Sequence, residues 1–286
     1  MFKNVLVGVD GHGGGRDALS LSTKLLAADG ELTLAHVYSG DPRLRRRLRA
    51  ERDPAGREHA LELLEHARAA ADVEAHLRTD ESSSVGRGLH ELCEAVGADL
   101  LVLGSSRRGL LGRVLIGDDT HAALNGAPCA IAIAPAGYAE QPGAIREIGV
   151  GYNGSPESEH AVRVARRLAA QHDAKLSAFE AVSLPTYAFL AGGAAVDDVV
   201  GDLVDSAREQ IAALGLEPHA VYGIPAEELT LYSASVDLLV VGSRDYGPIG
   251  RLVHGSTSRQ LARSVRCPLL VLTRAARERS EQGESR

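Results

Sequence analysis

Residues 240–258 read VVGSRDYGPIGRLVHGSTS and contain the pattern that decides the fold. The apolar run that leads into them, residues 238–241, is typical of a buried parallel strand. A loop punctuated by glycines follows, and we expect a helix from residue 259 onward. In α/β proteins a strand, a glycine-rich loop and a helix N-terminus form an anion site, because free backbone N–H groups and the helix dipole point at one place.

The same pattern occurs earlier in the chain, where residues 100–120 read LLVLGSSRRGLLGRVLIGDDT. Gly104 and Gly117 match Gly242 and Gly255 at one constant displacement, and the glycines between them match as well. A repeated set of glycines at one spacing predicts two copies of the same domain. A chain of 286 residues is long enough for two domains that each bury a core.

The composition excludes several classes of function. The net charge is −7, which disfavours nonspecific binding to nucleic acid. There is no Trp and there are only 3 Phe, so the core is aliphatic and the stacking platforms of single-strand binders are missing. We therefore expect no nucleic-acid partner.

Three cysteines, an odd number, argue against a disulfide framework and indicate a reducing compartment. Cys129 and Cys267 occupy repeat-equivalent places in apolar runs, so both are expected to be small core residues. No apolar run approaches the ~20 residues of a spanning helix, and the N-terminal one is too short for a signal peptide. We expect a cytoplasmic protein without a membrane partner.

Strand and helix patterns alternate along both halves. This alternation requires a parallel sheet with helices on both faces. We predict two doubly wound, five-stranded α/β domains at residues 1–137 and 146–275, a linker at 138–145 and a disordered tail at 276–286. Strands are expected at 5–9, 32–37, 73–77, 100–103 and 130–134, and again at 148–154, 176–182, 218–222, 236–241 and 269–272. Helices are expected at 18–26, 56–71, 85–96, 197–214 and 226–234.

Each half resembles a universal stress protein domain, over residues 2–136 and 146–274. Members that bind ATP carry Gly-x2-Gly-x9-Gly-[Ser/Thr] after the fourth strand and an Asp at the end of the first. The first half has Asp10 at the end of its first strand, and the second half has Asn153 there. The middle glycine of the motif is replaced in both halves, by Arg107 and by Asp245.

The resemblance implies a Rossmann-like fold of the adenine nucleotide alpha hydrolase type, with strand order 3-2-1-4-5. It also implies that fifth strands pair edge to edge, which within one chain gives a pseudo-dimer and leaves a homodimer open. The implied ligand is an adenine nucleotide, ATP or AMP, accompanied by Mg²⁺ where the phosphates need it. The matched residues are Asp10, Val37, Gly104 and Gly117 in the first half, and Asn153, Ala181, Gly242, Ser243, Gly255, Ser256, Thr257 and Ser258 in the second.

The two halves differ at the phosphate end of the implied site. The second half offers uncharged donors at residues 255–258, whereas the first half has Asp118 and Asp119, which are better explained as helix caps. We therefore expect the second half to hold a triphosphate better than the first. For the second half, a loop retained only for turning and packing is an equally good interpretation.

Other patterns point to no chemistry. Residues 11–15 (GHGGG) are expected to be a tight loop, since a dinucleotide fingerprint would need glycine at Arg16. The arginines within residues 43–52 suit a solvated helix face or an acidic partner. His59 and His66 are expected at the surface. Without catalytic motifs, we expect a sensor or regulator and at most a slow ATPase; the alternative is a nucleotide-free interaction module that acts through dimerisation.

Overall fold

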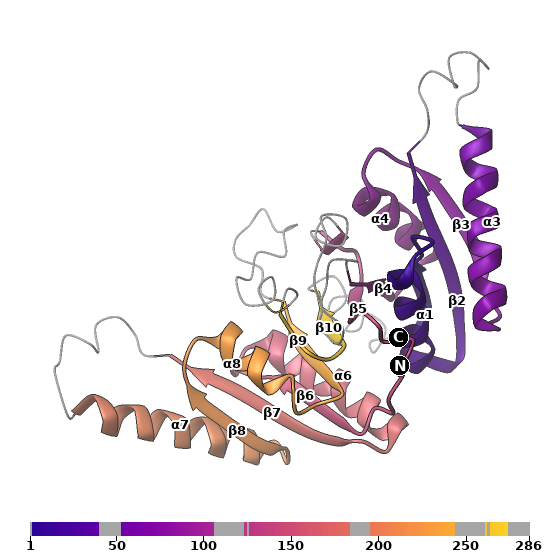
Figure 1. The fold of residues 1–286 in the computed structure, drawn as a ribbon. Coiled ribbons are helices and arrows are strands. Elements are labelled where there is room, and N and C mark those ends of the chain that lie inside the picture. Colours follow the sequence, from indigo (N-terminus) through magenta and orange to yellow (C-terminus); the bar gives the residue numbers. More distant parts are fainter. Residues whose placement is uncertain are drawn as a thin grey trace, which may run out of the picture.

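The computed structural model describes residues 2–39, 53–105, 123–124, 126–183, 195–243, 261 and 264–273. Within them, ten strands form one sheet in the order β3-β2-β1-β4-β5-β10-β9-β6-β7-β8 (Figure 1). Each half contributes five neighbouring strands with helices on both faces. The predicted class of two tandem α/β domains and the predicted strand order 3-2-1-4-5 are confirmed.

The first half carries the elements β1 (Phe2–Gly8), α1 (Gly13–Leu25), β2 (Leu26–Tyr38), α3 (Pro54–Ala71), β3 (His76–Glu81), α4 (Val85–Val96), β4 (Leu100–Gly104) and β5 (Ala130–Ala134). The second half repeats them as β6 (Glu147–Gly151), α6 (Pro156–His172), β7 (Lys175–Val182), α7 (Ala195–Ala213), β8 (Glu217–Tyr222), α8 (Pro225–Tyr232), β9 (Leu238–Gly242) and β10 (Leu269–Leu272).

The two halves join through their fifth strands. β5 and β10 pair antiparallel, with Leu270 opposite Ala132, whereas the other pairs in the sheet are parallel. Both strands are buried along their whole length. The predicted edge-to-edge contact of residues 130–134 and 269–272 is therefore confirmed, and it removes two apolar sheet edges from solvent.

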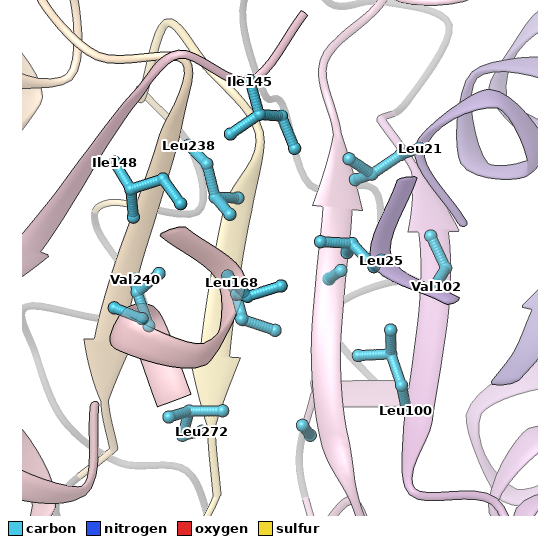
Figure 2. Close-up of a cluster of buried hydrophobic side chains, with 14 of the residues drawn as sticks. Leu21, Leu25, Leu100, Val102, Ile145, Ile148, Leu168, Leu238, Val240 and Leu272 are labelled. Atoms are coloured by element: carbon cyan, nitrogen blue, oxygen red, sulfur yellow. The ribbon is translucent and has the colours of Figure 1, made fainter. Parts of the chain in front are cut away.

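The core lies in two layers, one on each face of the sheet. Side chains of α1, α3, α6 and α7 cover one face, and those of α4 and α8 cover the other. Both layers run across the seam between the halves. Figure 2 shows this for the first layer, where Leu25 of α1 and Leu168 of α6 belong to one cluster with strand residues from both halves.

Three local differences from the predictions have physical reasons. Residues 11–15 are not wholly a loop, because α1 begins at Gly13. β3 begins at His76 rather than at residue 73, since α3 ends in a left-handed cap at Asp72 with φ of 51°. α6, which no prediction covered, begins with Ser155 as N-cap and Pro156 in its first turn.

Two expectations about single residues are confirmed. His59 and His66 are exposed. Cys93, Cys129 and Cys267 are buried and form no disulfide with one another, and burial raises the pKa of the Cys267 thiol to about 12, as suits an inert core residue. None of the described helices combines the length and the apolar composition needed to cross a membrane.

Candidate functional site

The candidate sites lie where strand order reverses within each half. β1 pairs with both β2 and β4, and β6 pairs with both β7 and β9. The helices that follow β1 and β4 leave toward opposite faces of such a sheet. In α/β sheets ligands bind at the carboxyl ends of the strands at such a point, and this is where the candidate sites are expected.

Asp10 follows β1 at the switch point of the first half. Its Oδ1 accepts hydrogen bonds from the backbone N–H groups of His12, at 2.9 Å, and Gly15, at 3.2 Å. These bonds hold the exposed carboxylate at the N-terminus of α1, where the helix dipole favours a negative charge. Within the described residues, Asp10 Oδ2 accepts no hydrogen bond. One carboxylate oxygen thus orients the group while the other stays available to a ligand.

Gly104 ends β4 beside the first turn of α1. A Cβ placed on it would lie 2.0 Å from the carbonyl oxygen of Gly14, so no other residue fits without moving the helix. A glycine that the resemblance assigns to ligand binding is therefore required for packing as well. Gly14 is closely packed in turn, since a Cβ on it would lie 3.0 Å from the carbonyl oxygen of Ser105.

The second half repeats this geometry with other side chains. A Cβ on Gly242 would lie 2.6 Å from the carbonyl oxygen of Glu157 in the first turn of α6. Asn153 stands where Asp10 stands in the first half, and its Oδ1 accepts from the backbone N of Ser155 at 3.2 Å and from Ser155 Oγ at 2.7 Å. The Asn153 side chain is therefore engaged in a turn that leads into α6.

Three further predicted residues lie on or directly after strands next to these switch points. Val37 is buried against α4, where a Cβ on Gly88 would lie 2.7 Å from Val37 Cγ1. Ala181 is half-buried near the carboxyl end of β7. Ser243 is 5% exposed, and its backbone N donates to Leu272. Gly117, Gly255, Ser256, Thr257 and Ser258 lie outside the described residues, as do Arg107, Asp118, Asp119, Asp245 and residues 43–52.

Two half-buried carboxylates were not predicted. Within the described residues, Glu180 Oε2 and Asp80 Oδ2 are buried oxygen atoms without a hydrogen-bond partner. Burial raises the pKa of Glu180, which precedes Ala181 in β7. An acidic residue within the predicted strand 176–182 was the available signal. Among the described residues, no three His, Cys, Asp or Glu side chains gather closely enough to hold a metal ion.

Comparison with known proteins gives relatives along much of the chain. A universal stress protein of Mycobacterium bovis is 31% identical over 181 residues, which is 61% of this chain and 61% of that protein. The match thus spans less than two thirds of this relative's length. A candidate universal stress protein from Pseudomonas aeruginosa, solved by crystallography, is 17% identical with a TM-score of 0.68 over 99% of this chain and 98% of its own, so the fold is shared.

The family assignment rests on both halves separately. The model of the universal stress protein family matches residues 1–135 and matches again at residues 144–273. The two matches correspond to the two five-stranded parts of the sheet. The chain therefore belongs to the universal stress protein family, with two of its domains in tandem.

Proposed function

We propose that this chain binds adenine nucleotides at the carboxyl ends of its strands and acts as a sensor or regulator without turnover. The family membership and the switch point of strand order in each half support this proposal. The observation that carries it is the Asp10 carboxylate, which two backbone N–H groups hold at the switch point while Oδ2 is left available. A carboxylate oxygen in that position can accept hydrogen bonds from ribose hydroxyl groups.

The residues expected to contact the ribose of a nucleotide favour binding at the first half. Asp10 offers a charged and oriented acceptor, whereas the Asn153 amide oxygen already accepts two hydrogen bonds from Ser155. A ligand at the second half would have to compete with this turn. Hydrogen bonds to a charged group are also stronger than those to a neutral one.

The residues expected to contact the phosphates of a nucleotide favour binding at the second half. Residues 255–258 (GSTS) carry no charge, whereas Asp118 and Asp119 would repel phosphate in the first half unless Mg²⁺ lies between them. We therefore infer a division of ligands. The second half binds ATP, and the first half binds AMP or the nucleoside.

Ligand-induced thermal shifts test this division. A ligand at 100 times its Kd stabilises the folded chain by about 2.7 kcal/mol, so a shift is measurable. Gly255→Asp should abolish the shift by ATP and Gly117→Asp should leave most of it. Asp10→Asn, which keeps the side-chain shape, should abolish the shift by AMP. Each variant is compared with its own ligand-free melting temperature, with and without Mg²⁺, and the opposite ordering would refute the division.

Mass spectrometry of the ligand released from the purified chain is an independent test. An adenine nucleotide at about one or two equivalents is the expected result. A chain that releases no nucleotide and shows no shift with ATP, AMP or adenosine would reject nucleotide binding altogether.

A nucleotide-free interaction module is the second candidate. The close packing of Gly104 against Gly14 and of Gly242 against Glu157 favours it, because it accounts for both glycines without a ligand. Such a module would act through the surfaces of the paired halves. The absence of any nucleotide shift, together with an unchanged fold, is the result that supports it.

A further inference from the structure

A cavity of about 340 Å³ lies at the seam between the halves, and this volume is within the range of sites for small ligands. Residues within 135–144, where the chain leaves β5, form one wall. Residues 236–237 and 266–268, which lead into β9 and β10, form the other. Because β5 and β10 pair antiparallel, the end of one strand lies beside the start of the other (Figure 1). The cavity therefore lies at the opposite ends of β9 and β10 from the candidate nucleotide site of the second half.

Asp237 lines this cavity with one carboxylate oxygen to spare. Its Oδ2 accepts hydrogen bonds from the backbone N–H groups of residues 146 and 147, at 2.8 and 2.9 Å. In the first half Asp99 takes the same place, directly before β4, but each of its oxygens accepts one backbone N–H, from residues 3 and 4. Within the described residues, Asp237 Oδ1 accepts no hydrogen bond. One oxygen thus satisfies the backbone, and the other is available to a ligand.

The Tyr138 side chain also lines the cavity and is fixed in place. Both neighbouring residues donate backbone hydrogen bonds to Asp17 of α1, and the Lys24 ammonium lies 5.1 Å from the ring centroid. Burial and the nearby charge of Asp237 raise the pKa of Tyr138 to about 12, so the hydroxyl stays protonated at neutral pH. Among the residues that the structure describes, this hydroxyl has no hydrogen-bond partner. It is therefore a second polar group that a ligand can use.

Arg266 brings a positive charge to the same cavity. It is exposed, and in the described part of the chain its guanidinium pairs with no carboxylate. In the first half Pro128 takes its place, since Cys129 matches Cys267 in the repeat. The fold therefore does not require a guanidinium group at this point. The apolar part of the lining consists of Pro135, Ala136, Val236 and Pro268.

We propose that this cavity binds a free amino acid with an apolar side chain. The Asp237 carboxylate and the Tyr138 hydroxyl accept hydrogen bonds from its ammonium group, and the Arg266 guanidinium binds its carboxylate. The apolar lining receives the side chain. A ligand with only one of the two charges would leave a cavity group without a partner. Glu140 adds a second negative charge to the lining, which disfavours acidic amino acids.

Isothermal titration calorimetry of the full chain without nucleotide tests the ligand class. L-Leucine should bind at one site per chain. Isocaproate lacks the amino group of leucine and isoamylamine lacks its carboxylate, so each should bind at least about tenfold more weakly through the loss of a charge-assisted interaction. L-Glutamate should also bind more weakly than leucine. No nucleotide takes part, so the result is independent of the proposed nucleotide binding.

Variants locate the binding. Arg266→Gln should weaken leucine binding by at least about tenfold, and so should Asp237→Asn, which keeps an acceptor for the two backbone N–H groups. Asp99→Asn makes the same change at the equivalent place in the first half, and this matched control should bind leucine as the parent chain does.

Three results would overturn the proposal. The first is no binding of leucine, valine or methionine at millimolar concentration. The second is isocaproate or isoamylamine binding as tightly as leucine. The third is leucine binding that survives Arg266→Gln unchanged, or that Asp99→Asn weakens as much as Asp237→Asn does.

Discussion

At the scale of single residues, a glycine and a tyrosine are fitted to one another in the core of the second half. A Cβ on Gly149 would lie 2.6 Å from Tyr232 Cε1, so the ring occupies the place of a side chain. Tyr232 also stacks on Phe179 with ring centroids 4.7 Å apart. Gly149 pairs with Leu239 as Leu6 pairs with Leu101, so the first half has leucine where the second has glycine.

Because the Tyr232 ring occupies the space of a side chain at residue 149, we predict that substitutions of Gly149 and Tyr232 have strongly non-additive effects on the free energy of unfolding. Gly149→Leu should destabilise the chain by about 3 kcal/mol through overpacking, and Tyr232→Leu by about 2 kcal/mol through a cavity. In the double variant the new leucine at residue 149 fills the space that the ring leaves. Its loss in the free energy of unfolding should therefore be smaller, by at least about 1 kcal/mol, than the two single losses added together. Urea unfolding of the four proteins measures the coupling, and strictly additive losses would contradict this account.

Glu180 predicts a pH-dependent stability. Burial raises its pKa, so between the ordinary and the raised value the folded chain binds more protons than the unfolded chain, and stability falls as pH rises through that window. Glu180→Gln should raise the free energy of unfolding at pH 7 by about 1 kcal/mol, a figure reduced for partial exposure. The gain should vanish below the ordinary pKa of Glu.

The control for this prediction is Glu147→Gln, whose side chain is 39% exposed and whose carboxylate pairs with Lys175 at 3.1 Å. It should give no such gain at neutral pH. A Glu180→Gln gain that is the same at low and neutral pH would show that the effect is not one of charge.

At the scale of elements, a buried aspartate connects helix α1 to the chain between the halves. Asp17 is 5% exposed, and its two oxygens accept from the backbone N of Gly137 at 2.9 Å and of Ala139 at 2.8 Å. Lys24, in the last turn of the same helix, donates to the carbonyl oxygen of Gly143. α1 therefore sets the path by which the chain leaves β5.

Asp17→Ala should lower the free energy of unfolding by about 2–3 kcal/mol, because it removes two charge-assisted hydrogen bonds from a buried place. Asp29→Ala is the matched control, since Asp29 is 69% exposed and its pair with Lys3 lies in solvent. The control should cost much less, because an exposed ion pair contributes little to stability. Chemical denaturation compares the two, and equal losses would refute a special role for Asp17.

At the scale of the whole molecule, the seam between β5 and β10 makes one sheet of two domains. Ile133 lies opposite Leu269, and Ile131 lies opposite Val271; all four are at most 1% exposed. The same contact buries both fifth-strand edges, so a homodimer would have to use other surfaces. The β3 and β8 edges remain at the ends of the sheet.

Ile133→Asp and Val271→Asp should each destabilise the chain severely, by more than about 3 kcal/mol, because a charge without a partner is placed in the core. Both should increase the binding of a dye that reports exposed apolar surface. Leu231→Asp, at an exposed position on α8, should leave stability and dye binding near those of the parent chain. Unchanged stability in both seam variants would place the contact between the halves elsewhere.

Much of the fold was predictable because its determinants are local in the chain. Apolar runs such as Leu238–Gly242 and Ala130–Ala134 mark buried strands by composition alone. Gly104 matches Gly242, and Gly117 matches Gly255 at the same displacement, so the repeat is visible in the sequence alone. The family resemblance then supplied the strand order and the pairing of fifth strands.

Other features depended on contacts between residues that are distant in sequence, and only the tertiary structure decided them. Gly104 is needed because Gly14 approaches it, and Asp17 acquires its partners 120 and 122 residues away. The sequence by itself determined the elements and their repetition, since propensity and periodicity act over a few residues; the structure decided which side chains meet, since close packing acts in space.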